Sequence, residues 1–438
     1  MNLETKLRSI GMRYFSAEKY QQKQRLKARK ARSKANSEAI VHYFHQVDDP
    51  YSHLSVQKLD LLRARYDLLF QPHLVSKPNV SYQGSAAHFD QWARQDCLNV
   101  AQDYGTEFEP TLKTPSSESI NRANDVLAGY LAQLEFAEIA IELGTNLWKN
   151  QAIETPALAS AAPNGMQAVS NGNALRESLG HYQGAMFYFD GEWFWGIDRI
   201  RLLETRLVNE GYGDSSVSIC VPEPTPNKVA DATAKEILLE YFPSLRSPYT
   251  AVGHQRVLDL IERSGVRVEV RPVMPMLMRG VPAPRAKQRY IITDAAREAR
   301  AHDVPFGKIV DPFGMPVKRA FALFPGAQVL GRAMPFVTAY LNAAWHEGTD
   351  ITTEIGLRQV VENAGMEWRQ IQEATKNTDW EAILSDNLDA MLAQDLWGVP
   401  SFRVSGGNQS AGKQGAQSYA CWGQDRIWRV ENEIAARI

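Results

Sequence analysis

Cysteine is scarce in this sequence. Cys97, Cys220 and Cys421 are the only three, and no two of them form a C-x-x-C pair. A disulfide framework is therefore not expected, and the sequence favours a cytoplasmic location, where thiols stay reduced. Cysteine and histidine do not cluster at the spacing of metal ligands either, so we expect no metal site.

Long apolar runs are also missing. No stretch of about 18 apolar residues occurs, which argues against a transmembrane helix. The N-terminus has no compact apolar segment after its basic residues, so no secretory signal is expected. With 438 residues, 44% of them hydrophobic and 22% charged, the chain can bury substantial cores. Disorder of the whole chain is excluded, and two large or three smaller domains are expected.

Charge is unevenly distributed along the chain. Residues 1–36 hold eleven Lys and Arg against two Glu, a net charge of +9, whereas the rest carries −11. We expect a basic N-terminal helix over residues 1–37 that is dispensable for any thiol chemistry. Such a helix could contact nucleic acid or an anionic membrane surface. The favoured alternative is a solvated helix lying on the acidic body, because no aromatic pattern interleaves with the charges.

The chain repeats part of its own sequence. Residues 43–59 align without a gap on residues 241–257, with five identical pairs: Tyr43/Tyr241, Phe44/Phe242, Pro50/Pro248, Tyr51/Tyr249 and Gln57/Gln255. Downstream, W-G-I-D-R-I at 195–200 matches W-G-Q-D-R-I at 422–427 in five of six positions. Since both pairs occur in the same order, we interpret the chain as a tandem duplication.

The duplication sets the expected domain boundaries. The first unit spans residues 38–210, the second spans 234–438, and the Gly-, Ser- and Pro-rich segment 211–233 links them. Two further segments, Ala157–Asn173 and Gly406–Gln417, have the composition of loops.

Each unit follows the same predicted order of elements. A strand, a helix that starts at Pro50 or Pro248 and a second strand are followed by a long helical stretch, two short strands and a last helix. The helical stretches cover about 85–150 and 285–395. Apart from them, this is the plan of thioredoxin. The predicted fold class is therefore α/β, with two thioredoxin-like domains in tandem, each carrying a helical insertion.

The second unit resembles the DsbA-like thioredoxin superfamily. Within it, the unit is most similar to the family of 2-hydroxychromene-2-carboxylate isomerase and kappa-class glutathione transferase. The matching motifs are Y-F-x-x-x-x-S-P-Y-T (241–250), R-P-V (271–273), K-Q-R-Y (287–290), G-V-P-S-F (398–402) and W-G-Q-D-R (422–426). The first unit resembles the same family more faintly, through D-P-Y-S (49–52) and F-D-G-E-W-F-W-G-I-D-R (189–199).

The resemblance implies a site for glutathione in the second unit. Ser247 starts the first helix, where a C-x-x-C stands in dithiol oxidoreductases, so it would hold the thiolate of a bound ligand as the catalytic residue. Val399 and Pro400, with a cis peptide bond, would hold the cysteinyl part. Gln424 and Asp425 would hold the γ-glutamyl end. Tyr249, Met276 and Arg279 are candidates for contacting a small aromatic or unsaturated substrate.

These assignments have plainer alternatives. Pro400 also suits the simple start of a strand over 401–404, and the methionines at 274, 276 and 278 also suit plain core packing. Ser247 and Pro248 also suit a simple helix start, and Asp425 with Arg426 suits a surface ion pair. The loop 274–284 lacks the asparagine that the family carries there. His254 could lie near a substrate, although a helical surface histidine is the more common case. In the first unit Asp49 replaces Ser247 and no proline matches Pro400. We therefore interpret the first unit as a degenerate copy that is retained for packing.

Three functions are therefore compatible with the sequence. The first is a glutathione-dependent isomerase or transferase of the 2-hydroxychromene-2-carboxylate isomerase type. The second is a non-catalytic binding or scaffold protein. The third is a protein like the thiol–disulfide oxidoreductases that lacks their C-x-x-C. Because the family is commonly dimeric, the chain is expected to act as a covalent pseudo-dimer or to form a homodimer.

Overall fold

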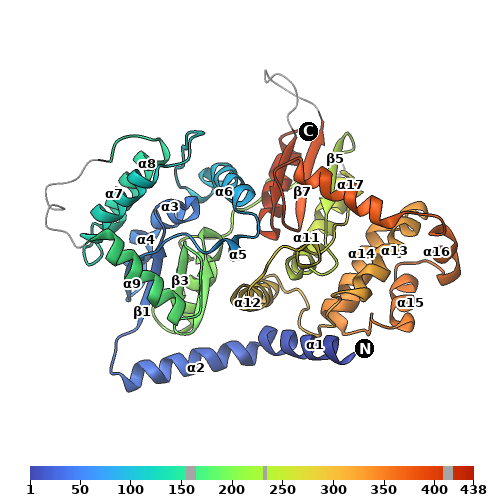
Figure 1. Ribbon diagram of the computed structural model, residues 1–438, viewed down its shortest axis with the longest axis horizontal. Coiled ribbons are helices and arrows are strands. Elements are labelled where there is room, and N and C mark those ends of the chain that lie inside the picture. The colour runs from blue at the N-terminus through green and yellow to red at the C-terminus, as the bar shows by residue number, and fades with distance from the viewer. Residues whose placement is uncertain (154–163, 230–233, 408–417) are drawn as a thin grey trace. The chain divides into compact units, whose positions relative to one another are not determined.

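The computed structural model describes residues 1–153, 164–229, 234–407 and 418–438 (Figure 1), and these divide into two compact units. The first unit comprises Gln21–Pro224 and Pro284–Lys287. The second comprises Met1–Tyr20, Thr225–Ala283 and Gln288–Ile438. Within the described ranges, no helix is both long and apolar enough to cross a membrane.

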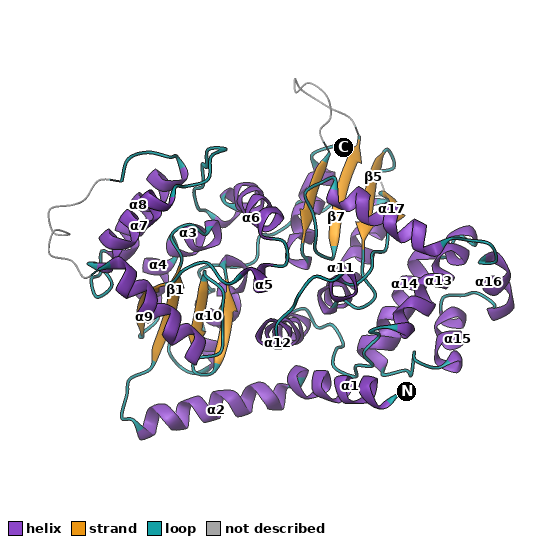
Figure 2. Cartoon of the chain, viewed as in Figure 1, coloured by secondary structure: helices purple, strands orange, loops and turns teal. Residues whose placement is uncertain are grey.

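The first unit is built on a four-stranded sheet (Figure 2). The strands follow the order β2-β1-β3-β4, in which β1 pairs parallel with β2 and antiparallel with β3, and β3 pairs antiparallel with β4. Its elements are β1 (Ile40–His45), α3 (Pro50–Val56), α4 (Leu59–Arg65), β2 (Leu69–Leu74), α5 (Val80–Gln83), α6 (Ala86–Val100), η1 (Gln102–Tyr104), α7 (Ser117–Ala128), α8 (Phe136–Trp148), α9 (Gly165–Ser178), β3 (Met186–Phe189), β4 (Glu192–Trp195), η3 (Ile197–Arg199) and α10 (Ile200–Asn209).

The second unit has a sheet of the same topology. Its strand order is β6-β5-β7-β8, with β5 parallel to β6, β5 antiparallel to β7 and β7 antiparallel to β8. Its elements are β5 (Ile237–Phe242), α11 (Pro248–Ser264), β6 (Arg267–Val270), η4 (Met276–Arg279), α12 (Arg285–Ala301), α13 (Met315–Val329), α14 (Ala333–Leu341), the π-helix η5 (Asn342–Glu347), α15 (Glu354–Asn363), α16 (Trp368–Ala374), α17 (Trp380–Leu392), β7 (Ser401–Gly406), β8 (Tyr419–Trp422), η6 (Gln424–Arg426) and α18 (Ile427–Ala435).

The predicted α/β class with two four-stranded sheets is confirmed. Helices α6 to α8 and α12 to α17 occupy the two stretches that were expected to be helical insertions. The first helix of each unit begins where the sequence predicts, because a capping side chain precedes a proline in the first turn. Asp49 accepts hydrogen bonds from Tyr51 N and Ser52 N, and Ser247 accepts one from Thr250 N.

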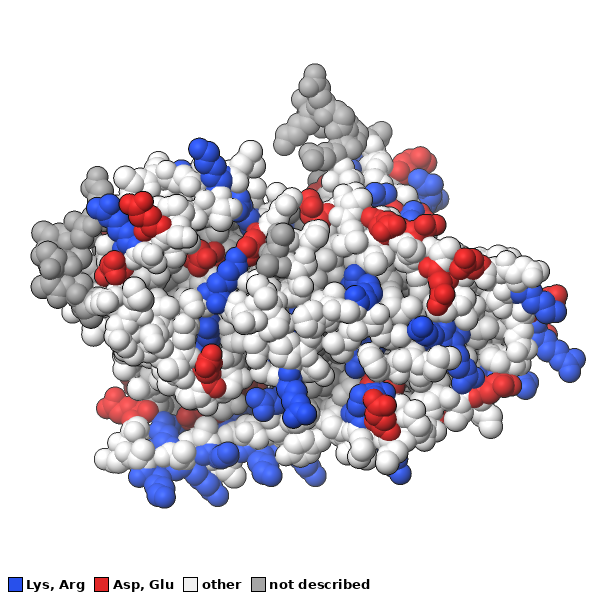
Figure 3. Space-filling view, viewed as in Figure 1, with Lys and Arg blue, Asp and Glu red and all other residues white. Residues whose placement is uncertain are grey.

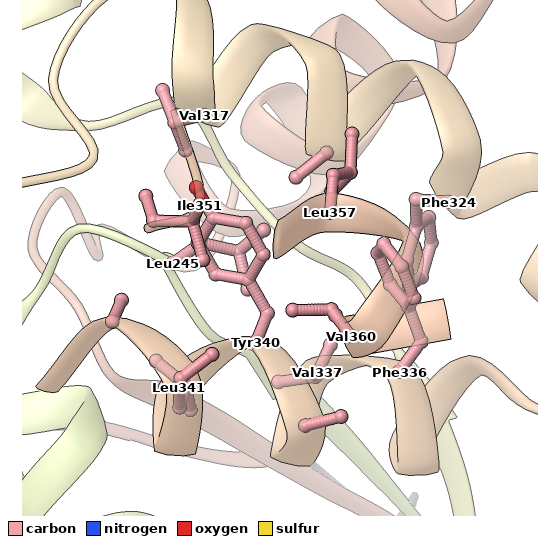
Figure 4. Close-up of a cluster of buried hydrophobic side chains, with 14 of the residues drawn as sticks. Leu245, Val317, Phe324, Phe336, Val337, Tyr340, Leu341, Ile351, Leu357 and Val360 are labelled. Carbon is pink, nitrogen blue, oxygen red and sulfur yellow. The ribbon is translucent and has the colours of Figure 1, made fainter. Parts of the chain in front are cut away.

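The helices of the second unit enclose a large apolar core. Figure 4 shows side chains from α13, α14 and α15 converging on it, among them Val317, Tyr340 and Val360. Leu245, which lies in the turn between β5 and α11, is fully buried in the same cluster. Trp345 Nε1 also donates to the Leu245 carbonyl at 3.2 Å. The helical insertion therefore holds the turn that leads to Ser247 in place.

The basic N-terminal segment forms two helices instead of the single helix expected. α1 (Leu3–Ser16) ends at Ala17, whose backbone is extended, and α2 (Glu18–Lys34) follows. In the first unit, α2 lies against acidic side chains and forms the ion pairs Arg25–Glu192, Arg29–Glu210 and Arg32–Asp190. Its lysines are exposed, and Figure 3 shows basic side chains gathered along this helix. Binding of a polyanion by these lysines stays a prediction.

The prediction of a loop over residues 157–173 is wrong for its C-terminal part. Residues 165–173 belong to α9, whose first turn is capped by Asn164, while 154–163 lie outside the described residues. The small residues there serve close packing rather than flexibility. A Cβ atom on Gly172 would lie 1.9 Å from the Leu74 carbonyl oxygen, so only glycine lets α9 approach β2 this closely. In the other predicted loop, residues 408–417 lie outside the described residues.

Candidate functional site

The turn between β5 and α11 brings Ser247 opposite the loop that precedes β7. Ser247 is nearly buried, with 9% of its surface exposed, and its Oγ accepts from Thr250 N at 3.1 Å. The same hydroxyl lies 3.4 Å from the Val399 carbonyl oxygen, to which it donates a long hydrogen bond. Since α11 runs for 17 residues, its N-terminus presents a partial positive charge beside this hydroxyl.

The Val399–Pro400 peptide bond is cis, as the resemblance implies. Two hydrogen bonds fix the loop around it. Gly423 N donates to the Pro400 carbonyl at 2.9 Å, and Ser401 Oγ donates to the Gly398 carbonyl at 2.8 Å. Gly398 itself lies against the Trp422 ring, where a Cβ atom would come within 2.0 Å. The structure therefore brings Ser247, Val399 and Pro400 together and ties their loop to the W-G-Q-D-R turn.

Gln424 and Asp425 occupy that turn, but the side chain of Gln424 is committed to partners within the protein. Gln424 is 1% exposed, and its Nε2 donates to Glu298 Oε2 of α12 at 2.9 Å. It also hydrogen-bonds to Arg256 of α11 and to Asp425. The amide therefore joins η6, α11 and α12 into one network, whereas Asp425 is half-buried beside it.

Tyr249 points toward α12. Its hydroxyl donates to Asp294 Oδ2 at 2.9 Å, and Asp294 is almost fully buried. The first unit repeats this arrangement, because Tyr51 donates to the buried Asp96 at 2.6 Å. Both pairs join residues 45 positions apart. Sequence reasoning missed both aspartates, although this shared spacing between the two units could have revealed them.

Met276 and Arg279 lie in η4, within the loop that lacks the family's asparagine. Arg279 reaches the loop of the cis proline, since its Nη2 donates to the Trp397 carbonyl at 3.0 Å. Its Nε is buried without a hydrogen-bond partner, and no carboxylate among the described residues pairs with its guanidinium. Burial lowers the pKa of Arg279. Met276 is half-buried, whereas the neighbouring Met274 and Met278 pack against the large apolar core.

A second hydroxyl that sequence reasoning missed lies one turn before Ser247. Ser244 is 1% exposed, and its Oγ has no hydrogen-bond partner among the described residues. Buried hydroxyls normally find a partner, so this one has an unused capacity to donate and accept. In the sequence S-L-R-S (244–247), the spacing of three residues between the two serines could have indicated a second hydroxyl near Ser247. Ser247 and Arg279 therefore supply hydrogen-bond donors near the cis proline, and Ser244 adds a buried hydroxyl three residues before Ser247.

His254 is a core residue and not the surface histidine that was favoured. It is 4% exposed, its Nδ1 lies 3.1 Å from the Tyr241 hydroxyl, and its Nε2 lies 2.8 Å from Thr338 Oγ1. Burial, followed by the charge of His346, lowers the pKa of His254 to about 3. The ring is therefore neutral at physiological pH and links β5 to α14.

The equivalent turn of the first unit has a different chemistry. Asp49 replaces Ser247 and is 4% exposed, and burial raises its pKa to about 7 even though Ser52 donates hydrogen bonds to it. Ala185 occupies the register position of Pro400, since it directly precedes β3 as Pro400 precedes β7. The Ala185 carbonyl still accepts from Gly196 N at 2.8 Å, as the Pro400 carbonyl does from Gly423. The scaffold of the turn is retained without the hydroxyl and the proline.

Comparison with known proteins defines the class of this fold. Residues 238–435, somewhat less than half of the chain, match the family model of the DSBA-like thioredoxin domain. The chain thus contains a DsbA-like thioredoxin domain in its second unit. No curated protein matches the chain.

Several solved structures match the chain at low identity. A 2-hydroxychromene-2-carboxylate isomerase is 18% identical, with a TM-score of 0.35, over 45% of this chain and 94% of its own. The cytosolic disulfide reductase DsbM from Pseudomonas aeruginosa is 16% identical, with a TM-score of 0.34, over 46% and 98%. The oxidoreductase DsbA from Xylella fastidiosa is 16% identical, with a TM-score of 0.28, over 49% and 92%.

Proposed function

We propose that the second unit binds glutathione with its sulfur at Ser247 and uses it in an isomerisation or transfer of the 2-hydroxychromene-2-carboxylate isomerase type. The observation that carries the proposal is the position of Ser247 Oγ, at the first turn of a 17-residue helix and 3.4 Å from the Val399 carbonyl oxygen. A ligand sulfur at this point would meet a hydroxyl donor and the positive end of the helix. Both favour the thiolate over the thiol.

The thiolate would act as a temporary nucleophile. It would add to an activated double bond of the substrate, with the electron pair moving onto a conjugated carbonyl oxygen. The former double bond could then rotate, and the return of the electron pair would expel the thiolate unchanged. Such covalent addition divides one difficult rotation into easier steps and involves no net oxidation. The task of the protein is to hold the sulfur ionised and to orient the substrate.

Arg279 would bind the substrate or an anionic end of the thiol ligand. Its guanidinium is mostly buried, bonded to the Trp397 carbonyl and without a carboxylate partner among the described residues. A buried cation that lacks a counter-ion is costly, and an anionic ligand would remove that cost. A carboxylate on the substrate fits this position, and Met276 offers an apolar neighbour for an unsaturated or aromatic framework.

A binding protein without turnover is the second candidate. One observation favours it: the Gln424 amide, which was expected to hold the γ-glutamyl end, is bonded to Glu298, Arg256 and Asp425. Cycling of an internal disulfide is not proposed, because S-P-Y-T at 247–250 contains no cysteine. The thiol of Cys220 is also unsuited to redox chemistry, since burial and Glu204 raise its pKa to about 11.

We interpret the first unit as a duplicate of the second unit that has lost the thiol chemistry. The identical strand order of the two sheets supports the interpretation as a tandem duplication, with Asp49 and Ala185 replacing Ser247 and Pro400. A thiolate beside an ionised Asp49 would be repelled by about 4 kcal/mol for charges about 4 Å apart at an effective dielectric constant of about 20. We therefore assign the thiol to the second unit alone. The chain would then resemble a covalent pseudo-dimer with one working site.

Calorimetric titration of the full chain with glutathione tests the proposal. Ser247→Ala should weaken binding several-fold, because a lost hydrogen bond costs about 0.5–1.5 kcal/mol, and somewhat more when the acceptor is ionised. S-methylglutathione, which cannot form a thiolate, should be insensitive to this substitution. Asp49→Asn in the first unit is the matched control and should leave glutathione affinity unchanged. Equal affinities for the wild type and Ser247→Ala would refute the assignment of the sulfur.

Turnover separates the two candidate functions. Isomerisation of 2-hydroxychromene-2-carboxylate can be followed by absorbance with and without glutathione. The enzyme hypothesis predicts a glutathione-dependent rate that falls more steeply than affinity in Ser247→Ala. Tight glutathione binding without turnover of this or related unsaturated carboxylates would favour the binding protein instead.

A further inference from the structure

The outer face of α1 carries a row of exposed apolar side chains. Leu3, Leu7, Ile10 and Tyr14, here called the apolar row, are 73%, 60%, 52% and 49% exposed. Their spacing of four, three and four residues places them within an arc of about 60° on the helix, at about 3.6 residues per turn. A surface helix normally turns such a face toward the core. An apolar row that stays exposed marks a surface that contacts another molecule or a membrane.

The inner face of α1 fixes this orientation of the helix. Ser9 is buried, and its Oγ accepts from Asp311 N at 2.9 Å. Arg13 Nε donates to the Ile309 carbonyl at 2.7 Å, and Phe15 packs against the large apolar core of the second unit. Rotating α1 to bury the apolar row would break both hydrogen bonds. The exposure of the row therefore follows from the way in which α1 is docked.

Aromatic rings join the end of the apolar row to the start of α2. The ring of Tyr20, in the first turn of α2, lies edge-on to those of Tyr14 and Phe15, with centroids 5.1 Å away in both cases. Only Ala17 separates the two helices. Tyrosine combines an apolar ring with a polar hydroxyl, and it is enriched at the boundary between lipid and water.

The lysines of α2 form a second row, which follows the apolar row along the chain. This lysine row consists of Lys19, Lys23, Lys27, Lys30 and Lys34, all of them exposed. Their spacing places them within an arc of about 80° on the helix. Within the described part of the chain none of them has an ion-pair partner, whereas three arginines of the same helix pair with acidic side chains. The fold therefore leaves the charge of the lysine row available to a partner.

Two kinds of partner fit these rows less well than a membrane. A nucleic acid would contact the lysine row through its phosphates, yet the apolar row has no use in such a contact. A second copy of α1 could cover the apolar row, whose spacing is that of a helix pair. However, the row is flanked on one side by the cations Lys6 and Arg13, which would face each other in an antiparallel pair and repel. On the other side Glu4 is already paired with Arg8.

We propose that α1 and α2 attach the chain to the surface of a membrane that contains anionic phospholipids. The apolar row enters the boundary between headgroups and acyl chains, and the lysine row binds the phosphate groups of the lipids. Helices of this kind lie in the plane of the interface, with their apolar face in lipid and their basic residues among the headgroups. The proposal does not depend on the thiol chemistry assigned to Ser247.

Flotation of the full chain with lipid vesicles tests the proposal. The vesicles consist of phosphatidylcholine with about 30 mol% phosphatidylglycerol, and pure phosphatidylcholine serves as the reference. We expect at least tenfold tighter binding to the anionic vesicles, and a loss of this difference as NaCl is raised from about 50 to about 500 mM, because salt screens the lysines. No binding to either vesicle, or equal affinity for both, would overturn the proposal.

Substitutions in the apolar row separate insertion from simple charge attraction. The double variant Leu7→Gln, Ile10→Gln should weaken binding to the anionic vesicles at least tenfold. Both side chains are exposed, so the variant should keep the fold, as urea unfolding verifies. The matched control is Leu112→Gln, Leu134→Gln, which removes two exposed leucines of the first unit and should leave binding unchanged. Equal losses in the two double variants, or none in either, would overturn the role of the apolar row.

Substitutions in the lysine row and two further measurements exclude the other partners. Lys27→Gln, Lys30→Gln should weaken binding at least fivefold, whereas Lys27→Arg, Lys30→Arg keeps the charge and should retain it. A dimer in sedimentation without vesicles that Leu7→Gln, Ile10→Gln dissociates would assign the apolar row to a second copy and overturn the proposal. Tighter binding to a short DNA duplex than to the vesicles, unaffected by the same variant, would assign the lysine row to nucleic acid and overturn it as well.

Discussion

Arg8 of the N-terminal segment donates from Nε to Asp311 Oδ2 at 2.6 Å, and Asp311 is fully buried. The other oxygen of Asp311 accepts from Arg246 at 2.9 Å, and Arg246 directly precedes Ser247. Both guanidinium groups also lie over the ring of Phe313, at 5.1 and 4.8 Å from its centroid. The segment that was expected to be dispensable therefore shares a buried carboxylate with the turn of the candidate site.

Arg8→Ala should accordingly destabilise the second unit. A hydrogen bond to a charged group contributes about 1.5–3 kcal/mol, and the guanidinium of Arg8 is partly exposed, so we expect a loss of about 1–2 kcal/mol in the free energy of unfolding. Urea denaturation followed by tryptophan fluorescence measures it. Lys6→Ala, which removes an exposed cation from the same helix, should change stability by less than about 0.5 kcal/mol. Equal stabilities of the two variants would show that the contact is energetically silent.

The two tyrosine–aspartate pairs should behave alike. Tyr51→Phe and Tyr249→Phe each remove one hydroxyl from a buried carboxylate without creating a cavity. Each carboxylate keeps other interactions, so a loss of about 1–2 kcal/mol per variant is expected. Thermal and urea unfolding of the two single variants measure it. A loss confined to Tyr249→Phe would mean that only the second unit still depends on this contact.

These pairs also show which features of the fold and the site could be predicted from the sequence and which could not. The strands and the starts of α3 and α11 follow from local signals: apolar runs, a cap before a proline, and repeated motifs. The contact of Ser247 with the Val399–Pro400 loop was instead implied by the resemblance to thioredoxin-like folds. Asp294 and Glu298 carry no local signal of this kind, because both lie within a helix and their partners are distant in the sequence. The one sign of Asp294 is that it lies 45 residues after Tyr249, as Asp96 lies 45 residues after Tyr51. Only the docking of α12 against α11 and η6 turns their side chains into buried acceptors.

For two other features, a helical glycine and the basic residues of α2, the local sequence suggested the wrong structural role. Gly172 lies in a segment whose composition is that of a loop, yet it forms part of α9, because its missing side chain allows contact with the Leu74 carbonyl. The arginines and lysines of α2 alternate in one basic run. Nevertheless the arginines at 25, 29 and 32 form ion pairs with acidic residues more than 150 positions away, whereas the lysines stay exposed. Pairing at such separations depends on the tertiary fold, which local patterns do not encode.

The stability of the first unit should depend on pH through Asp49. Burial raises its pKa to about 7 in the folded protein, from about 3.8 for an exposed aspartate. The folded state thus holds a proton that the unfolded state releases between pH 4 and 7, so the contribution of this group to stability falls as pH rises through that window. Three pKa units correspond to about 4 kcal/mol as an upper estimate.

Asp49→Asn should remove this dependence. Asparagine keeps an oxygen for the helix cap but does not ionise, so the variant should match the wild type near pH 4 and exceed it above pH 7. Urea unfolding of both proteins from pH 4 to 8 gives the difference, in which the contributions of all other groups cancel. A constant difference across this range would mean that Asp49 titrates normally in the folded protein.

Arg279 offers a way to separate binding from structure. Its charge is mostly buried, its pKa is lowered by that burial, and no carboxylate among the described residues compensates it. Replacing such a residue by an apolar one of similar length should leave the stability of the free protein unchanged or raise it. The same substitution should weaken an anionic ligand about tenfold, since a charge-assisted hydrogen bond of about 1.5 kcal/mol is lost.

Arg279→Met should therefore weaken ligand binding without lowering stability. Urea unfolding of the unliganded chain and calorimetric titration with glutathione measure the two quantities on the same sample. Arg279→Lys keeps the positive charge and should recover part of the affinity, although it loses the planar guanidinium. Arg267→Met, which removes an exposed arginine from β6, serves as the control for a general change in net charge. If Arg279→Met lowers stability while glutathione affinity stays unchanged, Arg279 acts only as a structural tie to the Trp397 carbonyl, because a ligand-binding cation would leave the opposite pattern.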